Sequence, residues 1–70
     1  MTTKIEKLLE KQGKSRYALA VHSYGRPVTL AYDIVRGEHR ASARIRAKFC
    51  EFLNVADGEI FTDRGMALNE

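Results

Sequence analysis

The sequence predicts an all-α fold, a compact single domain of five short helices. Apolar residues recur at the three- and four-residue spacing of a helix, and no segment shows the sustained alternation of a strand. Capping residues and glycines divide the chain into short helical segments. Seventy residues are enough for one small domain, and neither a linker nor an internal repeat divides them.

Two helices are predicted in the first third of the chain. The first is predicted over 3–12, because TKIE at its start has the form of a capping box and Gly13 ends the apolar run. The second is predicted over 15–23 (SRYALAVHS), with Ser15 as its N-cap. Since this segment is apolar nearly all round, we expect the second helix to be well buried.

A third helix is predicted over 27–36. Pro27 has φ preset near the helical value and no N–H to leave unpaired, so it suits the first helical position, and Gly37 suits the position past the end. At about 100° per residue the segment divides into two arcs. The inner arc holds Pro27, Leu30, Ala31, Ile34 and Val35. The outer arc holds Val28, Thr29, Tyr32, Asp33 and Arg36.

The outer arc is unusual for a helix that faces only water. A surface helix is normally rich in Lys, Glu and Gln, whereas this arc carries valine, threonine and tyrosine next to arginine. Such a face is typical of a helix that lies in a groove of another molecule, and DNA is the leading candidate. An ordinary half-exposed helix is the alternative interpretation.

The last third of the chain predicts two more helices. Ser42 suits the N-cap of an amphipathic helix over 42–53, and Asp57 suits the start of a one-turn helix that runs to Phe61. We interpret residues 62–70 as a C-terminal tail outside a domain that spans 1–61.

Charge is distributed unevenly along the chain. Residues 14–48 hold eight Lys and Arg against two acids, whereas residues 49–70 hold one arginine against five acids. Within a net charge of +3, the middle is therefore basic and the end acidic. This asymmetry is typical of a protein with one face on phosphates. A solvated basic surface is the plainer alternative.

Other features of the composition limit the environment and the chemistry. Cys50 is the only cysteine, so no internal disulfide is possible and a reducing cytoplasm is expected. No run approaches the roughly 18 apolar residues of a membrane span. His22 and His39 have no ligand partners at metal spacing, and no catalytic set can be assembled. We therefore expect no enzyme activity, no metal and no cofactor, and we interpret Cys50 as a packing residue.

The order of these elements resembles the Cro/phage-repressor type of helix-turn-helix protein, the lambda-repressor-like XRE family. The residues that carry the resemblance are GKSRYALA at 13–20, Gly25, Gly37 and FLNVADGEIF at 52–61. It covers about residues 4–61. The chain departs from the family in having four residues between Ala20 and Gly25, where three are usual.

A second departure concerns a pair of positions. Where the family commonly has an arginine in the first helix and a glutamate before the closing glycine, this chain has Leu9 and Val35. A buried ion pair exchanged for an apolar pair is often neutral or stabilising. We therefore predict that Leu9 contacts Val35.

The resemblance implies a sequence-specific transcriptional regulator, a prokaryotic or phage repressor that places helix 27–36 in the major groove of an operator. Thr29 suits a base edge or a phosphate, Val28 a thymine methyl group, and Arg36 a phosphate or guanine. Tyr32 suits either kind of contact. A carboxylate repels phosphate, so we expect Asp33 to hold Arg36 or Arg26 rather than to contact a cytosine.

Phosphate contacts are expected at helix N-termini, where free N–H groups and the helix dipole favour anions. These ends carry Lys14, Ser15 and Arg16 before and in the second helix, and Arg40, Ser42 and Arg44 around the start of the fourth. The resemblance makes Arg16 the principal phosphate contact. We interpret Arg46 and Lys48 as a solvated face of the fourth helix. The predicted DNA-binding set is Arg16, Arg26, Val28, Thr29, Tyr32, Arg36, Arg40, Ser42 and Arg44.

The resemblance also implies a homodimer on a two-fold operator. The candidate dimer residues are Ile60, Phe61, Met66 and Leu68, an apolar run that either closes the core or forms a dimer surface, and we favour the dimer surface. Two alternatives to a plain repressor stay open. One is an antitoxin that binds both its operator and a toxin, and the other is a protein-interaction module that keeps the fold without DNA binding.

Overall fold

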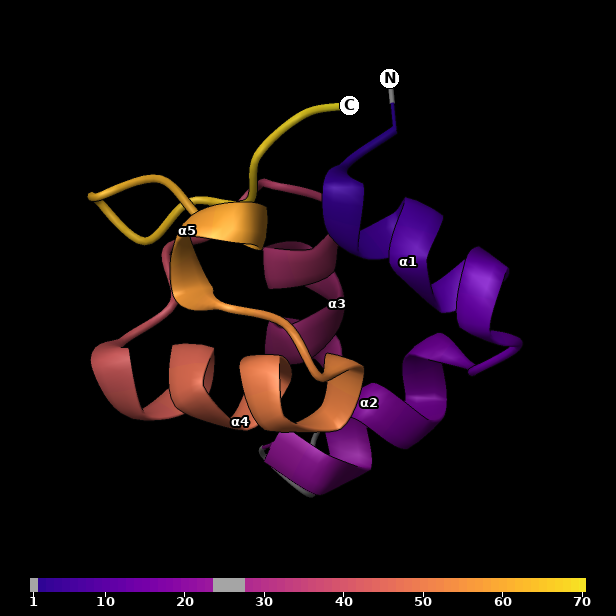
Figure 1. The fold of residues 1–70 in the computed structure, drawn as a ribbon. Helices are drawn as coiled ribbons and strands as arrows, with labels where there is room; N and C mark the ends of the chain where they lie inside the picture. The colour runs from indigo at the N-terminus through magenta and orange to yellow at the C-terminus, as the bar shows by residue number, and fades with distance from the viewer. Residues whose placement is uncertain (1, 24–27) are drawn as a thin grey trace.

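The computed structural model describes residues 2–23 and 28–70, and over these residues the protein is all-helical (Figure 1). Its five helices are α1 (Lys4–Gln12), α2 (Arg16–Ser23), α3 (Thr29–Val35), α4 (Ala43–Leu53) and α5 (Asp57–Ile60). Only two isolated β-bridges occur within the described ranges, and no strand. The predicted all-α class and the predicted order of the five helices are confirmed. Within the same ranges, none of the helices has the length and apolar character needed to cross a membrane.

Local capping explains where α1 and α4 begin and end. Thr3 and Glu6 form the predicted capping box, in which the Thr3 hydroxyl accepts from the Glu6 N–H at 3.2 Å. Gly13 ends α1 with a φ of +65°, in the left-handed region that glycine adopts without strain. Ser42 caps α4, and Asn54 ends it at a φ of +57°.

The third helix is shorter than predicted. Its first residue is Thr29 and Val28 is the N-cap, while Arg36 forms the C-cap before Gly37, which has a φ of +82°. The predicted first position, Pro27, lies outside the described residues. The helix therefore consists of about two turns whose buried residues are Ala31, Ile34 and Val35.

The core lies where the inner faces of all five helices meet. Its largest fully buried side chains include Phe49, Leu19, Ile34 and Ile5, and the Phe49 and Phe61 ring centroids are 5.8 Å apart. The whole core consists of Ile5, Leu9, Leu19, Ala20, Ala31, Ile34, Val35, Ala41, Ile45, Phe49, Leu53, Ile60, Phe61 and Ala67. Both Leu9 and Val35 belong to it, and their direct contact stays a prediction.

The expectation that α2 is well buried is wrong. Leu19 and Ala20 are its only buried residues, while Tyr17 is 48% and Val21 is 44% exposed. The reason is that α2 packs with one side against α3 and α4, so the opposite side of this short helix faces outward.

Residues 62–70 fold back onto the domain and bring the two chain ends together (Figure 1). The Leu68 N–H donates to the Ile60 carbonyl, and the Lys4 N–H donates to the Leu68 carbonyl, both at 2.8 Å. Beside these bonds, Thr3 forms an antiparallel bridge with Asn69. The segment is thus continuous with the core rather than a separate tail.

This arrangement corrects the predicted dimer surface. Ile60 is 0% and Phe61 is 2% exposed within one chain, so these two side chains close the core and cannot meet a second copy. Met66 and Leu68 are half-buried. Ile60 and Phe61 thus follow the first of the two interpretations, because closing so small a core requires these side chains, while a dimer contact through Met66 and Leu68 stays a prediction.

Arg46 also differs from the prediction. Its Nη1 donates to the Ala41 carbonyl at 2.7 Å and its Nε to an Asp57 carboxylate oxygen at 3.1 Å. This arginine therefore joins α4 to the loop before it and to α5 instead of forming a solvated face. Lys48 is half-buried.

Candidate nucleic-acid interface

The candidate interface centres on α2 and α3, which pack against each other. Arg26 and Gly25 fall in residues 24–27, outside the described part. On α3, Thr29 and Arg36 are exposed, whereas Val28 and Tyr32 are half-buried and pack against the core. The accessible part of the predicted outer arc is therefore narrower than the helical wheel indicates.

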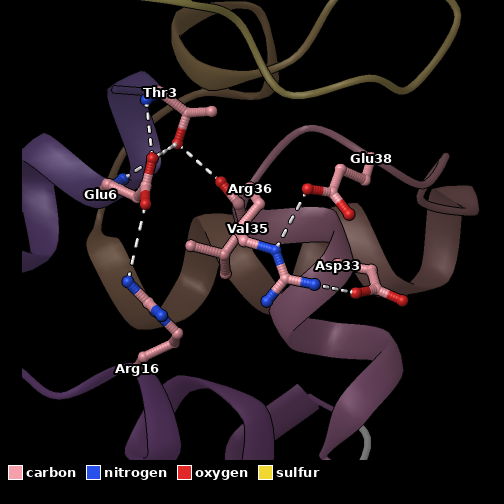
Figure 2. A network of polar contacts seen from close by, with 7 residues as sticks. All are labelled: Thr3, Glu6, Arg16, Asp33, Val35, Arg36 and Glu38. Atoms are coloured by element: carbon pink, nitrogen blue, oxygen red, sulfur yellow. Dashed lines mark hydrogen bonds and ion pairs between the residues drawn. The ribbon is translucent and has the colours of Figure 1, made fainter. Parts of the chain in front are cut away.

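Arg16 at the first position of α2 contacts side chains of α1 and α3, and Figure 2 shows its ion pair with Glu6 of α1. Its guanidinium lies 3.5 Å from a Glu6 carboxylate oxygen of α1, and its guanidinium carbon lies 5.8 Å from the ring centroid of Tyr32 on α3. The Arg16 side chain as a whole is 44% exposed. The predicted phosphate-binding arginine is thus held in place and accessible.

A buried threonine fixes α1 against the last turn of α3. Thr3 is fully buried, and its hydroxyl donates to the Val35 carbonyl at 2.6 Å (Figure 2). The carbonyls at a helix C-terminus have no partner within the helix, so this bond satisfies one of them. Through Thr3 and Glu6, the N-terminus of α1 sets the relative positions of Val35 and Arg16.

The C-terminal end of α3 carries a small charge cluster. Arg36 Nη2 pairs with the Asp33 carboxylate, and Arg36 Nε donates to Glu38 Oε2 at 3.3 Å (Figure 2). The predicted pairing of Asp33 with Arg36 is confirmed. Because two carboxylates surround one guanidinium, the three residues together carry a net charge of −1 at neutral pH.

The N-terminus of α4 presents a second group of polar side chains. Arg40, Ser42 and Arg44 are all exposed. Ser42, Arg44, Ser23 and Ile45 line a hollow of about 340 Å³ between the end of α2 and the start of α4. This end of an eleven-residue helix carries the positive end of the helix dipole, which favours an anion.

Lys14 has a different partner from the one expected, whereas Ser15 caps α2 as predicted. The Lys14 ammonium donates to the Phe52 carbonyl at 2.7 Å and lies 4.8 Å from the Phe52 ring centroid. Lys14 therefore stabilises the C-terminus of α4, beside the Gln12 amide, which donates to the Leu53 carbonyl at 2.9 Å. The Ser15 hydroxyl accepts from the Ala18 N–H at 3.0 Å and acts as a cap.

Within the described ranges, no three His, Cys, Asp or Glu side chains come together in a group that could hold a metal ion. His22 Nε2 lies 3.1 Å from a Glu51 carboxylate oxygen. The ring centroids of His22 and Phe52 are 5.3 Å apart. The two contacts of His22 join α2 to α4.

Burial, reinforced by the nearby Asp57 carboxylate, raises the pKa of the half-buried Cys50 thiol above its ordinary 9.0, so the thiol is protonated at neutral pH.

Comparison of the chain with protein-family models, with curated proteins and with solved structures gives no match.

Proposed function

We propose that the protein is a sequence-specific DNA-binding regulator in which α2 and α3 form a lambda-repressor-like helix-turn-helix. The observation that carries this proposal is the position of Arg16, which lies beside Tyr32 at the junction of α2 and α3 with 44% of its side chain exposed. In this arrangement, α3 lies in the major groove and Arg16 binds a phosphate next to it.

The exposed side chains divide between base reading and backbone contacts. Thr29, on the first turn of α3, is the only residue of the outer arc that is exposed and uncharged, so it is the main candidate for a base edge. Arg40, Ser42 and Arg44 surround the N-terminus of α4 and bind a second phosphate group. Val28 and Tyr32 supply apolar contact at the edge of this surface.

In this proposal the protein binds a two-fold operator as a homodimer in the cytoplasm, without a cofactor, and represses by occupying the operator. Basic residues at positions 14–48 support DNA as the partner, because a polyanion attracts a basic surface over a long range.

Selection of bound sequences from a random pool of duplex DNA tests the proposal. Three proteins are compared with the unchanged chain: Thr29→Ala, Arg16→Gln and, as a matched control for charge, Lys7→Gln on α1. We expect an inverted repeat whose preferred base changes at one position per half-site with Thr29→Ala. Arg16→Gln should weaken all sites uniformly and reduce the salt slope by about one, and Lys7→Gln should do neither. Absence of an enriched motif would refute the proposal.

A second candidate function is that of a protein-interaction module, or of an antitoxin that also binds a toxin. The observation that favours it is the pair of carboxylates on Arg36, because a net negative charge at the end of α3 suits a protein surface better than phosphates. Salt dependence separates the two functions. Binding through several phosphates weakens steeply with salt, while a mainly apolar protein interface changes little.

A further inference from the structure

A groove of about 310 Å³ runs between α1 and α5, away from the candidate nucleic-acid interface. Three lysines of α1 and two half-buried apolar side chains line most of it: Lys4, Lys7, Lys11, Leu8 and Val55. Residues 67–70 run past α5 toward the start of α1 (Figure 1), and Glu70 reaches the groove.

The lysines lie on the flank of α1 opposite to α2. At about 100° per residue, Lys4, Leu8 and Lys11 fall within one narrow strip of the helix surface. Glu6, which contacts Arg16 of α2, lies on the other side of the buried face formed by Ile5 and Leu9. The groove is therefore a separate surface, and its use does not depend on DNA binding.

The charges in the groove are only partly compensated. Lys7 pairs with Glu70 at 3.9 Å, so one carboxylate from the chain itself already lies against this strip. For Lys4 and Lys11, the described part of the chain supplies no ion pair. On the opposite side, the Glu59 carboxylate accepts from the Ala56 N–H at 2.6 Å and serves as a cap of α5. Two cations without an ion pair thus flank an apolar floor, while the two carboxylates in the groove, Glu70 and Glu59, already have partners in Lys7 and the Ala56 N–H.

We propose that this groove binds a short acidic segment of another protein, which places an apolar side chain on Leu8 and Val55 and carboxylates on Lys4 and Lys11. The strip of lysine, leucine and lysine is complementary to acidic residues on both sides of an apolar one. Duplex DNA fits less well, because a phosphate backbone offers no apolar group to the floor formed by Leu8 and Val55.

A second copy of the chain is also a poorer occupant. Its carboxylates are largely engaged: Glu51 pairs with His22, Asp57 with Arg46, and Glu38 with Arg36. A foreign segment supplies acids without breaking such pairs. The complementary partner is therefore another protein chain.

A random twelve-residue peptide library displayed on phage, selected on the full chain, tests this proposal. We expect enriched peptides with a Leu, Ile, Met or Phe between two acidic residues. Fluorescence anisotropy with a labelled enriched peptide should then show affinity about tenfold lower for the double variant Lys4→Gln, Lys11→Gln. Lys48→Gln on α4 is the control for loss of positive charge and should change the affinity less than about twofold.

Three results would overturn the proposal. The first is enrichment of peptides without acids, or no enrichment. The second is peptide binding that the double variant leaves unchanged while its helical circular dichroism matches that of the parent chain. The third is displacement of the peptide by duplex DNA or by self-association of the chain, which would assign the groove to a nucleic acid or to a second copy. The DNA selection described above is read out separately, so failure of either proposal leaves the other intact.

Discussion

Gly65 approaches Ala41 so closely that only a residue without a side chain fits there. The Ala41 N–H donates to the Gly65 carbonyl at 2.9 Å, and a Cβ on Gly65 would lie 2.5 Å from the Ala41 carbonyl oxygen. Gly65 also has a φ of +87°. The turn before Met66 is thereby locked onto the loop that precedes α4, which holds the C-terminal segment in place.

Replacing this glycine should be costly. Gly65→Ala combines a left-handed backbone with an overlap against backbone atoms, so we expect a loss of about 2–4 kcal/mol in the free energy of unfolding. Urea denaturation followed by circular dichroism measures it. Gly58→Ala is the matched control, because a Cβ there meets nothing within 4 Å and should be neutral or stabilising. Equal midpoints for the two variants would contradict the packing of residues 62–66 described here.

Thr3 should contribute to stability through its hydroxyl rather than its shape. Thr3→Val keeps the shape but removes the cap on the Glu6 N–H and leaves the buried Val35 carbonyl without its donor, at a cost of about 2 kcal/mol. Thr3→Ser keeps both bonds and should cost about 1 kcal/mol or less. Thermal and urea unfolding of the two variants distinguish these effects, and a serine variant as unstable as the valine variant would show that the hydroxyl matters little.

Removing the negative charge of Asp33 should strengthen DNA binding if the proposed function is right. Asp33→Asn leaves Arg36 with Glu38 as its one anionic partner, so the guanidinium becomes more available to phosphate. We expect affinity for random duplex DNA to rise about threefold to tenfold and the salt dependence to steepen. Asp63→Asn, an equal change of charge at an exposed position, is the control. An equal rise in both variants would mean that only net charge matters.

The thiol of Cys50 should react slowly while the protein is folded. Burial is the main cause of its raised pKa, so less thiolate is present than in the unfolded chain at the same pH. Alkylation by iodoacetamide should therefore be slower in buffer than in urea.

The raised pKa of Cys50 should also make the free energy of unfolding depend on pH. Because the folded-state pKa is the higher one, its contribution to the free energy of unfolding is complete below the ordinary value of 9.0 and is lost as pH rises through the folded-state pKa. Comparing urea midpoints of the parent chain and Cys50→Ala across this range measures the loss.

The helices were predictable because their signals are local. The capping box at Thr3, the left-handed Gly13 and the cap at Ser42 depend on residues within one turn of each other, and all three are confirmed. The C-terminal segment was not predictable in the same way. Its apolar residues fit either a core or a dimer surface, and the choice depends on hydrogen bonds to Thr2 and Lys4 at the other end of the chain.

In the candidate site, too, contacts within one helix were predictable, whereas contacts between helices were not. The pairing of Asp33 with Arg36 is a contact between residues three apart on one helix, so the sequence alone indicates it. The contacts of Arg16 with Glu6 and Tyr32 join separate helices, and only the packing of α1, α2 and α3 reveals them. Tyr32 and Val28 are more buried than a helical wheel predicts, because a wheel does not contain the neighbouring helices.

The pairing of Thr3 with Asn69 has a consequence for the order in which the protein forms. On a ribosome, α1 leaves the exit tunnel well before its hydrogen-bonding partner at Leu68 is translated. The nascent chain therefore carries an open core until Leu68 has emerged, even though its helices form from local signals. Closing the ring between the two ends is the slow, non-local step of a protein that is otherwise built from neighbouring contacts.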